Sequence, residues 1–223
     1  MAFLSNDEEE QNLPPCSKDT PFENAKSSSI KINLKYILGD VTTPTFCVRF
    51  DHNDKYIAAG RGDGSIAIFN VLTGKTSYML NESMEEPMPT TIVRWRPICA
   101  PGVTKNVMIA ANAEGSLTHY HTTSGKTLNR IFSDVNQLFT CDYKPDGYEF
   151  VAAGQDSVIR VYDEQTRQLK VELTGGVNGE PGHSNRVFCA KYYQDDPNCI
   201  ITGGWDMCVK IWDTRQPDPI RSI

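Results

Sequence analysis

The stretch Ile200–Arg215, which reads IITGGWDMCVKIWDTR, decides the fold of this 223-residue chain. It opens with the apolar run Ile200–Gly203 and bends at Asp206. After the bend, Val209 and Ile211 alternate with residues that would face the other side of a strand, which is the period of two expected of β-structure. The stretch therefore predicts two short antiparallel strands joined by a tight turn.

Imperfect copies of this stretch recur along the chain. Each copy has a small pair before the turn, an acidic residue at the turn, and then an aromatic residue followed by a closing polar residue. The acidic residues are Asp63, Glu114, Asp156 and Asp206, the aromatic residues are Phe69, Tyr120, Tyr162 and Trp212, and the closing residues are Asn70, His121, Asp163 and Asp213. The spacing of the copies is close to the ~40–45 residues of one propeller blade, which predicts a repeat protein.

These copies resemble the tryptophan–aspartate (WD) repeats of β-propeller proteins. The likeness is fullest in the last copy, where Gly182-His183 supplies the upstream half of the repeat. The resemblance implies an all-β fold of about four four-stranded blades that form a partial or incomplete ring, because propellers close with typically 4–8 blades. It also implies that missing blades or another chain complete the ring, and we expect a truncated form of a longer propeller.

The predicted organisation is a short arm followed by the repeats. Residues 1–29 contain acidic, Ser-rich and Pro-containing stretches and few apolar residues, so a disordered arm is expected there. Residues 30–223 are the predicted propeller region, with repeats at about 45–80, 91–132, 139–174 and 183–223. Before the first repeat, Ile30–Leu38 alternates in polarity and is predicted to form a strand.

Composition restricts the class of protein. The net charge is −6, whereas nucleic acids and anionic membranes select a basic face, so neither partner is expected. No apolar run approaches the ~20 residues that cross a bilayer, and the N-terminus lacks the pattern of a signal peptide. The seven cysteines are scattered, which favours reduced thiols. The expected location is therefore the cytoplasm, with the nucleus as an alternative.

In the last repeat, the resemblance assigns a buried hydrogen-bonded set to His183, Thr202, Asp206 and Trp212. The imidazole would bond the turn carboxylate and the hydroxyl, and the hydroxyl would reach the indole N–H. Such a set is tolerated because its members satisfy one another, whereas an unpaired buried polar group costs about 1–3 kcal/mol. The spacing implies no nucleophile or oxyanion donor beside this His–Asp pair, so no enzymatic activity is expected.

His119 and His121 point the same way on one predicted strand, which is the spacing of a possible pair of metal ligands. Two ligands do not make a zinc site without a third or fourth, and no cluster of Cys and His residues is evident in the sequence. The sequence therefore predicts neither a metal nor a cofactor.

The leading functional hypothesis is a non-catalytic scaffold that binds partner proteins through loops on the propeller rim. Trp205 is the most specific candidate contact, because aromatic anchors dominate the energetics of interfaces. Asn185 and Arg186, in the preceding loop, are expected on the same face. The structural alternative is that Trp205 packs against a loop of a neighbouring blade.

Two further hypotheses give the scaffold a narrower role. Ile200–Arg215 resembles a box found in substrate receptors of cullin-type ubiquitin ligases, and the resemblance marks Asp206, Trp212, Asp213 and Arg215. By that likeness, Arg215 would help to dock the ligase adaptor. The other hypothesis is a component that assembles cytoskeletal or ciliary structures.

Overall fold

The computed structural model describes residues 33–39, 42–80, 88–98, 105–132 and 136–223. The chain separates into two compact units, Met1–Lys35 and Tyr36–Ile223, and every described strand lies in the second. The predicted arm, residues 1–29, lies outside the described residues. Throughout the described part of the chain there is no helix long and apolar enough to cross a membrane.

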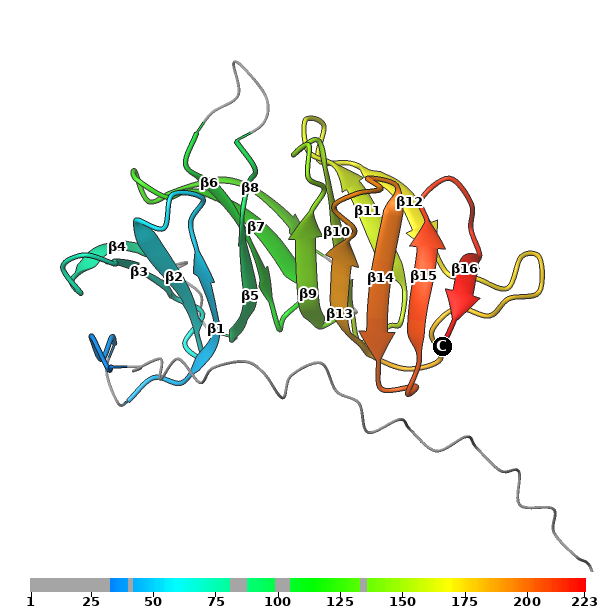
Figure 1. Cartoon of the computed structure of the whole chain (residues 1–223), viewed down its shortest axis with the longest axis horizontal. Coiled ribbons are helices and arrows are strands. Elements are labelled where there is room, and N and C mark those ends of the chain that lie inside the picture. Colours follow the sequence, from blue (N-terminus) through cyan, green and yellow to red (C-terminus); the bar gives the residue numbers. More distant parts are fainter. Residues whose placement is uncertain (1–32, 40–41, 81–87, 99–104, 133–135) are drawn as a thin grey trace, which may run out of the picture. The chain divides into compact units, whose positions relative to one another are not determined.

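The strands form four antiparallel four-stranded sheets, here named blades 1 to 4 (Figure 1). Blade 1 consists of β1 (Thr45–Phe50), β2 (Tyr56–Arg61), β3 (Ile66–Asn70) and β4 (Thr76–Leu80). Blade 2 consists of β5 (Thr90–Trp95), β6 (Val107–Asn112), β7 (Ser116–His121) and β8 (Lys126–Phe132). Blade 3 consists of β9 (Leu138–Tyr143), β10 (Glu149–Gly154), β11 (Ile159–Asp163) and β12 (Leu169–Leu173). Blade 4 consists of β13 (Val187–Tyr192), β14 (Cys199–Gly204), β15 (Val209–Asp213) and β16 (Pro219–Ser222). The predicted all-β fold of four four-stranded blades is confirmed.

In blades 1, 3 and 4, the acid at the tight turn is explained by the backbone that it holds, whereas in blade 2 Asn112 accepts the backbone N–H of Glu114. Asp63 accepts the backbone N–H of Ser65 at 3.0 Å, and Asp206 accepts the backbone N–H of Cys208 at 3.3 Å. Asp156 forms the same bond in blade 3. An aspartate that bonds the backbone two residues on mimics a backbone turn, so it favours a bend between the second and third strands.

The recurring aromatic residue marks a change of register in every blade. The pairing of the third and fourth strands shifts next to the aromatic residue in all four sheets. Such a bulge bends the strand locally. The four rings are buried, with exposed fractions of 7% for Phe69, 4% for Tyr120, 7% for Tyr162 and 0% for Trp212.

The core consists of apolar layers between successive blades. The first strands pack in order, since β1 contacts β5, β5 contacts β9 and β9 contacts β13. The layer between blades 3 and 4 contains Val151, Ala153, Ile159, Val161 and Leu173 from blade 3 and Val187, Ala190, Tyr192, Ile200 and Trp212 from blade 4. Similar layers join blade 1 to blade 2 and blade 2 to blade 3.

The other face of blade 4 repeats this apolar pattern but is open to solvent. Its residues Ile201, Val209, Ile211 and Ile223 stand where blade 3 has Val151, Ile159, Val161 and Leu173. Ile159 and Leu173 are fully buried, whereas Val209 is 43% and Ile223 67% exposed. Arg221 stands where blade 3 has Val171, and the rest of this pattern is a core layer in blade 3 and a surface in blade 4.

The segment before blade 1 departs from the sequence-based expectation. The alternation over Ile30–Leu38 predicts a strand, but its described part, from residue 33 onward, forms none, so the prediction is wrong there. Leu38 instead packs on the cluster that contains Phe69, and the Tyr36 hydroxyl donates a hydrogen bond to the Leu72 carbonyl oxygen at 2.6 Å. Alternation alone does not make a strand without a neighbour to pair with.

Candidate functional site

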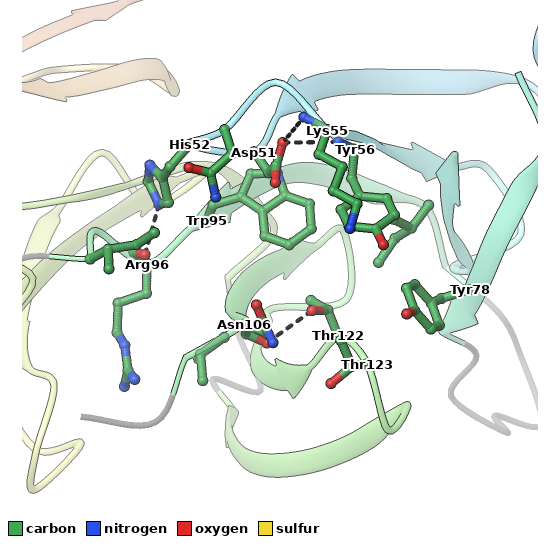
Figure 2. A pocket seen from close by; sticks show the side chains of 14 residues that line it. Asp51, His52, Lys55, Tyr56, Tyr78, Trp95, Arg96, Asn106, Thr122 and Thr123 are labelled. Atoms are coloured by element: carbon green, nitrogen blue, oxygen red, sulfur yellow. Dashed lines mark hydrogen bonds between the residues drawn. The ribbon is translucent and has the colours of Figure 1, made fainter. Parts of the chain in front are cut away.

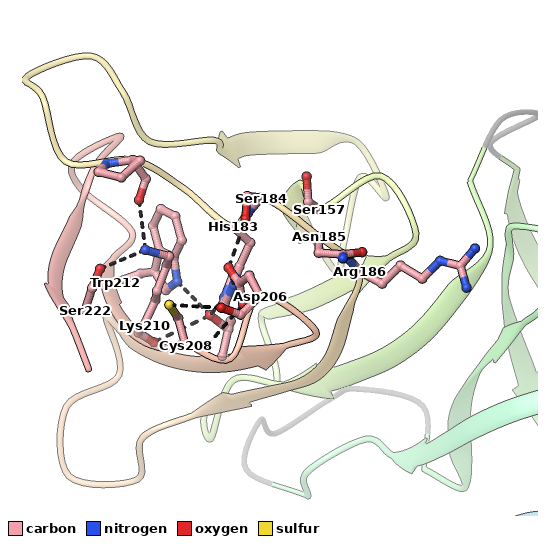
Figure 3. A network of polar contacts seen from close by, with 12 residues as sticks. Ser157, His183, Ser184, Asn185, Arg186, Asp206, Cys208, Lys210, Trp212 and Ser222 are labelled. Carbon is pink, nitrogen blue, oxygen red and sulfur yellow. Dashed lines mark hydrogen bonds and ion pairs between the residues drawn. The ribbon is translucent and has the colours of Figure 1, made fainter.

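The connection into β13 and the strands β14 and β15 bring four polar side chains together (Figure 3). His183 Nδ1 lies 2.7 Å from Asp206 Oδ2, and His183 Nε2 lies 2.7 Å from Thr202 Oγ1. Trp212 donates its indole N–H to the same hydroxyl oxygen at 2.8 Å. All but Asp206 are buried. These are the four residues that the sequence assigned to a hydrogen-bonded set, here named the polar set.

One arrangement of protons satisfies every bond in the polar set. An ionised Asp206 can only accept, so His183 Nδ1–H donates to it. Nε2 of the neutral imidazole then accepts from the Thr202 hydroxyl, whose oxygen accepts the Trp212 indole N–H. Burial lowers the pKa of His183 against the opposing influence of Asp206, which favours this neutral imidazole. Burial acts to raise the pKa of Asp206, but the hydrogen bond from His183 and other contacts outweigh it, so that pKa is lowered.

A cluster beside the polar set is here named the aromatic surface: the exposed Phe188 and Trp205, Met207 in the same turn as Trp205, and the half-buried Phe139 and Arg186. Trp205, in the β14–β15 turn, is 62% exposed, and its ring centre lies 5.1 Å from that of Phe188. Phe188 in turn stacks on Phe139 with centres 4.7 Å apart. Arg186 places its guanidinium 5.4 Å from the Trp205 ring centre, a cation–π distance.

The loop before β13 is braced against the turn that carries Trp205. The Trp205 backbone N–H donates to the Arg186 carbonyl at 2.9 Å, and Asn185 Oδ1 accepts the Arg186 backbone N–H at 2.8 Å. Figure 3 shows the Arg186 side chain extending away from the polar set. The structure therefore brings together Trp205, Asn185 and Arg186. Trp205 also touches its neighbour Phe188, yet most of its ring faces solvent.

Met207 belongs to this surface and was not singled out by the sequence. It is 95% exposed and has a φ of 60°, in the left-handed region that favours glycine. The equivalent turn positions in blades 1 and 2 are Gly64, with φ 78°, and Gly115, with φ 99°. An alignment of the four turn sequences identifies Met207 as unusual, because two of the other copies have glycine at this position. Phe139 and Phe188 were also missed.

Arg215 lies in the turn after β15 and is bonded locally. Its Nη2 lies 2.6 Å from Asp213 Oδ2 and its Nε 2.8 Å from Asp213 Oδ1, a bidentate pair. The Arg215 side chain is 69% exposed. The contact with Asp213 accounts for its position, and the geometry gives no separate support to adaptor docking.

The two histidines of β7 have separate partners. His119 is fully buried with Nε2 3.0 Å from Glu164 Oε2, and His121 Nδ1 lies 2.7 Å from Ser124 Oγ. Within the described ranges, no group of three or more His, Cys, Asp or Glu side chains is arranged to hold a metal ion.

Comparisons with known proteins agree with this architecture. The family model described as "WD domain, G-beta repeat" matches residues 35–70 and 177–213. The "66 kDa stress protein" of Physarum polycephalum is 29% identical over 136 residues, which are 60% of this chain and 22% of that protein. The guanine nucleotide-binding protein subunit beta of Lymnaea stagnalis is 27% identical over 109 residues, which are 48% of this chain and 30% of that protein.

A solved structure shows the same fold. A chain in the "Crystal Structure of Mitotic Checkpoint Complex" aligns with a TM-score of 0.67 and 15% sequence identity, covering 83% of this chain and 52% of that one. This chain thus spans only part of the length of each of these three proteins. WD40 proteins are typically protein-interaction modules. Two segments of the chain therefore match WD repeats, and the chain has the fold of a WD-repeat β-propeller.

Proposed function

We propose that the protein is a non-catalytic scaffold that binds partner proteins through the aromatic surface of blades 3 and 4. The observation that carries the proposal is the exposure of Trp205, which leaves 62% of that residue in water. Fully burying a large apolar side chain is worth about 1.5–3 kcal/mol, so a partner that covers the ring gains free energy that folding does not use. Tryptophan and arginine are also the residues that most often dominate binding energy, and Arg186 lies on the same ring.

The backbone beneath this surface is fixed before any partner arrives. Asp206, next to Trp205 in the turn, is bonded to His183 and to the backbone N–H of Ser184 at 3.2 Å. A surface that is already ordered loses less conformational entropy on binding, which favours affinity. The polar set thus supports the function indirectly, by holding the turn in one conformation.

Met207 supports the same proposal. The left-handed backbone of Met207 costs stability, which a glycine at this position would restore. Its exposed apolar side chain also costs stability, which a polar residue would restore. Flexible, polarisable methionine side chains are used at surfaces that accept varied partners. Folding alone does not account for a methionine at this position, whereas contact with a partner protein does.

The central test is Trp205→Ala in the full chain, with affinity purification and mass spectrometry as the measurement. Gln155→Ala is the matched control, because Gln155 stands at the same exposed turn position in blade 3. We expect Trp205→Ala to weaken capture of at least one partner by tenfold or more, about 1.4 kcal/mol or above. Circular dichroism should show both variants folded.

If Trp205→Ala retains the same partners at the same levels as Gln155→Ala, the proposal is wrong. The ligase hypothesis is a narrower form of the same scaffold role, and it requires a cullin adaptor among the captured proteins. Loss of that adaptor in Arg215→Ala, with the other partners retained, would single it out. The cytoskeletal or ciliary hypothesis requires components of those structures among the captured proteins instead.

A further inference from the structure

The layers between successive blades differ in the charged groups at one end. Between blades 2 and 3, Glu164 lies 3.0 Å from Arg96 Nη1 and 3.0 Å from His119 Nε2. Between blades 3 and 4, Glu149 pairs with Lys170 and lies 3.5 Å from Lys144. The layer between blades 3 and 4 differs from that between blades 2 and 3, because Thr214 is the equivalent of Glu164 there and a cavity of about 380 Å³ is lined by Glu149 and these two lysines. Only between blades 2 and 3 does a carboxylate at this position fill the space between the blades.

Between blades 1 and 2, the corresponding space is a cavity of about 270 Å³ (Figure 2). Its apolar lining is Tyr56, Ile68, Tyr78, Trp95, Ile98 and Val107, and its polar lining is Asp51, His52, Asn53, Lys55, Arg96, Asn106, Thr122 and Thr123. Ligand pockets commonly measure about 300–1,000 Å³, so this cavity has room for one side chain or a small molecule of similar size.

Two residue differences explain the cavity. The backbone N–H of Thr122 donates to the Asn106 carbonyl at 2.9 Å, just as that of Glu164 donates to the Tyr148 carbonyl at 2.8 Å, so Thr122 is the equivalent of Glu164. The Thr122 hydroxyl turns back to the Asn106 carbonyl at 2.9 Å and does not reach between the blades. Ile68 likewise stands where blade 2 has His119.

A cation at this cavity has no carboxylate partner among the described residues. The Lys55 ammonium lies 5.2 Å from the centre of the Tyr56 ring, and Figure 2 shows the two side chains next to each other. The nearby carboxylate of Asp51 accepts the backbone N–H groups of Lys55 and Tyr56 at 2.7 and 2.9 Å. Asp51 is thus used to hold its own turn.

We propose that the cavity between blades 1 and 2 is a second binding site, which takes a carboxylate carried on an apolar stem. The carboxylate pairs with Lys55, and the stem lies against Tyr56, Tyr78 and Trp95. The ligand supplies the group that Glu164 supplies between blades 2 and 3. A glutamate beside an aromatic residue in a partner peptide has this chemistry, and so does a small aromatic acid.

The test is a titration of the full chain with 3-phenylpropanoate and with the neutral 3-phenylpropanamide, followed by NMR of the Ile68 and Val107 methyl groups. We expect saturable shifts with the carboxylate and binding about tenfold weaker with the amide. Lys55→Gln, at an exposed position, should abolish that preference without affecting folding. A capped acetyl-Gly-Phe-Glu-Gly-amide peptide is titrated in the same way. If it binds more tightly than 3-phenylpropanoate, the ligand is a peptide segment, and if it binds more weakly, the ligand is a small aromatic acid.

Thr122→Glu is a second variant that fills the cavity from within, as Glu164 does in the next layer. Thr122→Glu should remove binding of 3-phenylpropanoate and of 3-phenylpropanamide. Arg186→Ala, on the aromatic surface, should leave the binding of these two compounds unchanged. Equal binding of the acid and the amide would overturn the proposal, and so would the absence of shifts with all three probes in the unmodified chain. A carboxylate preference that survives Lys55→Gln would overturn it as well.

Discussion

Blades 3 and 4 have the same strand pattern but hold their hairpins together by different means. In blade 4, the Thr202 hydroxyl links the rings of His183 and Trp212. In blade 3, the position of Thr202 is taken by Ala152, and the aromatic position is taken by Tyr162. Tyr162 stacks on a neighbouring phenylalanine with ring centres 5.2 Å apart.

The turn acids differ in the same way. Asp206 bonds an imidazole in blade 4, whereas Asp156 in blade 3 forms an ion pair with Arg160 at 2.6 Å. Each blade has a filled interior between its strands and a fixed turn between its second and third strands. The two blades show that either hydrogen-bonded polar groups or packed apolar groups can fill the interior. The polar solution is more easily damaged, because removal of one member leaves the others buried and unpaired.

The largest expected effect is that of Trp212→Ala. Truncating a fully buried aromatic residue costs about 3–5 kcal/mol of unfolding free energy, and the value should lie at the upper end because Thr202 also loses its donor. The matched Tyr162→Ala in blade 3 should cost less, and urea denaturation measures both. If Tyr162→Ala is the more costly change, then blade 4 is not held by its polar set in the way described.

Thr202→Ala is expected to have the next largest effect. It introduces into blade 4 the residue that blade 3 has at this position, and it leaves the His183 and Trp212 ring nitrogens without their shared partner. We expect a loss of about 1–3 kcal/mol in the free energy of unfolding, measured by urea denaturation. A His183→Leu background should reduce that loss. Additive losses in the double variant would show that the two residues do not act together.

Mild acid should weaken blade 4 more than blade 3. Burial lowers the folded-state pKa of His183, so the unfolded chain binds more protons as the pH falls through its ordinary value of about 6.5. The free energy of unfolding attributable to this group should therefore decrease from about pH 7 to about pH 5. Asp206, whose pKa is lowered, should keep its charge over that range. Urea midpoints at several pH values should show a shallower dependence in His183→Gln, and an unchanged slope would contradict this origin.

The smallest expected effect is a gain in stability. Met207→Gly relieves a left-handed backbone and should raise the free energy of unfolding by up to about 1 kcal/mol, while it weakens partner capture. The reverse change, Gly64→Met in blade 1, should destabilise, because a Cβ there would lie 2.9 Å from the Met88 carbonyl oxygen. Thermal melting measures both. A destabilising Met207→Gly would mean that folding itself requires this side chain.

The sequence predicts the blades well because their signals are local. The turn acids, the small pairs and the alternation in stretches such as Val209–Asp213 lie within one hairpin. What depends on a neighbouring blade is harder to predict. The cavity between blades 1 and 2 arises because Thr122 and Ile68 face each other across a layer, and neither is unusual within its own strand. The contacts of Phe139 with Phe188 also join two blades.

The open face of blade 4 has a consequence for the behaviour of the protein in solution. Ile201, Val209, Ile211 and Ile223 place an apolar β-surface in water, with Lys191 and Arg221 at the two ends of its central cross-strand row, on a chain whose net charge is −6. Sulfate and similar excluded salts strengthen hydrophobic attraction while ions screen the repulsion between molecules. Colloidal stability should therefore be greatest at low ionic strength, and light scattering should rise with added sulfate before any unfolding begins.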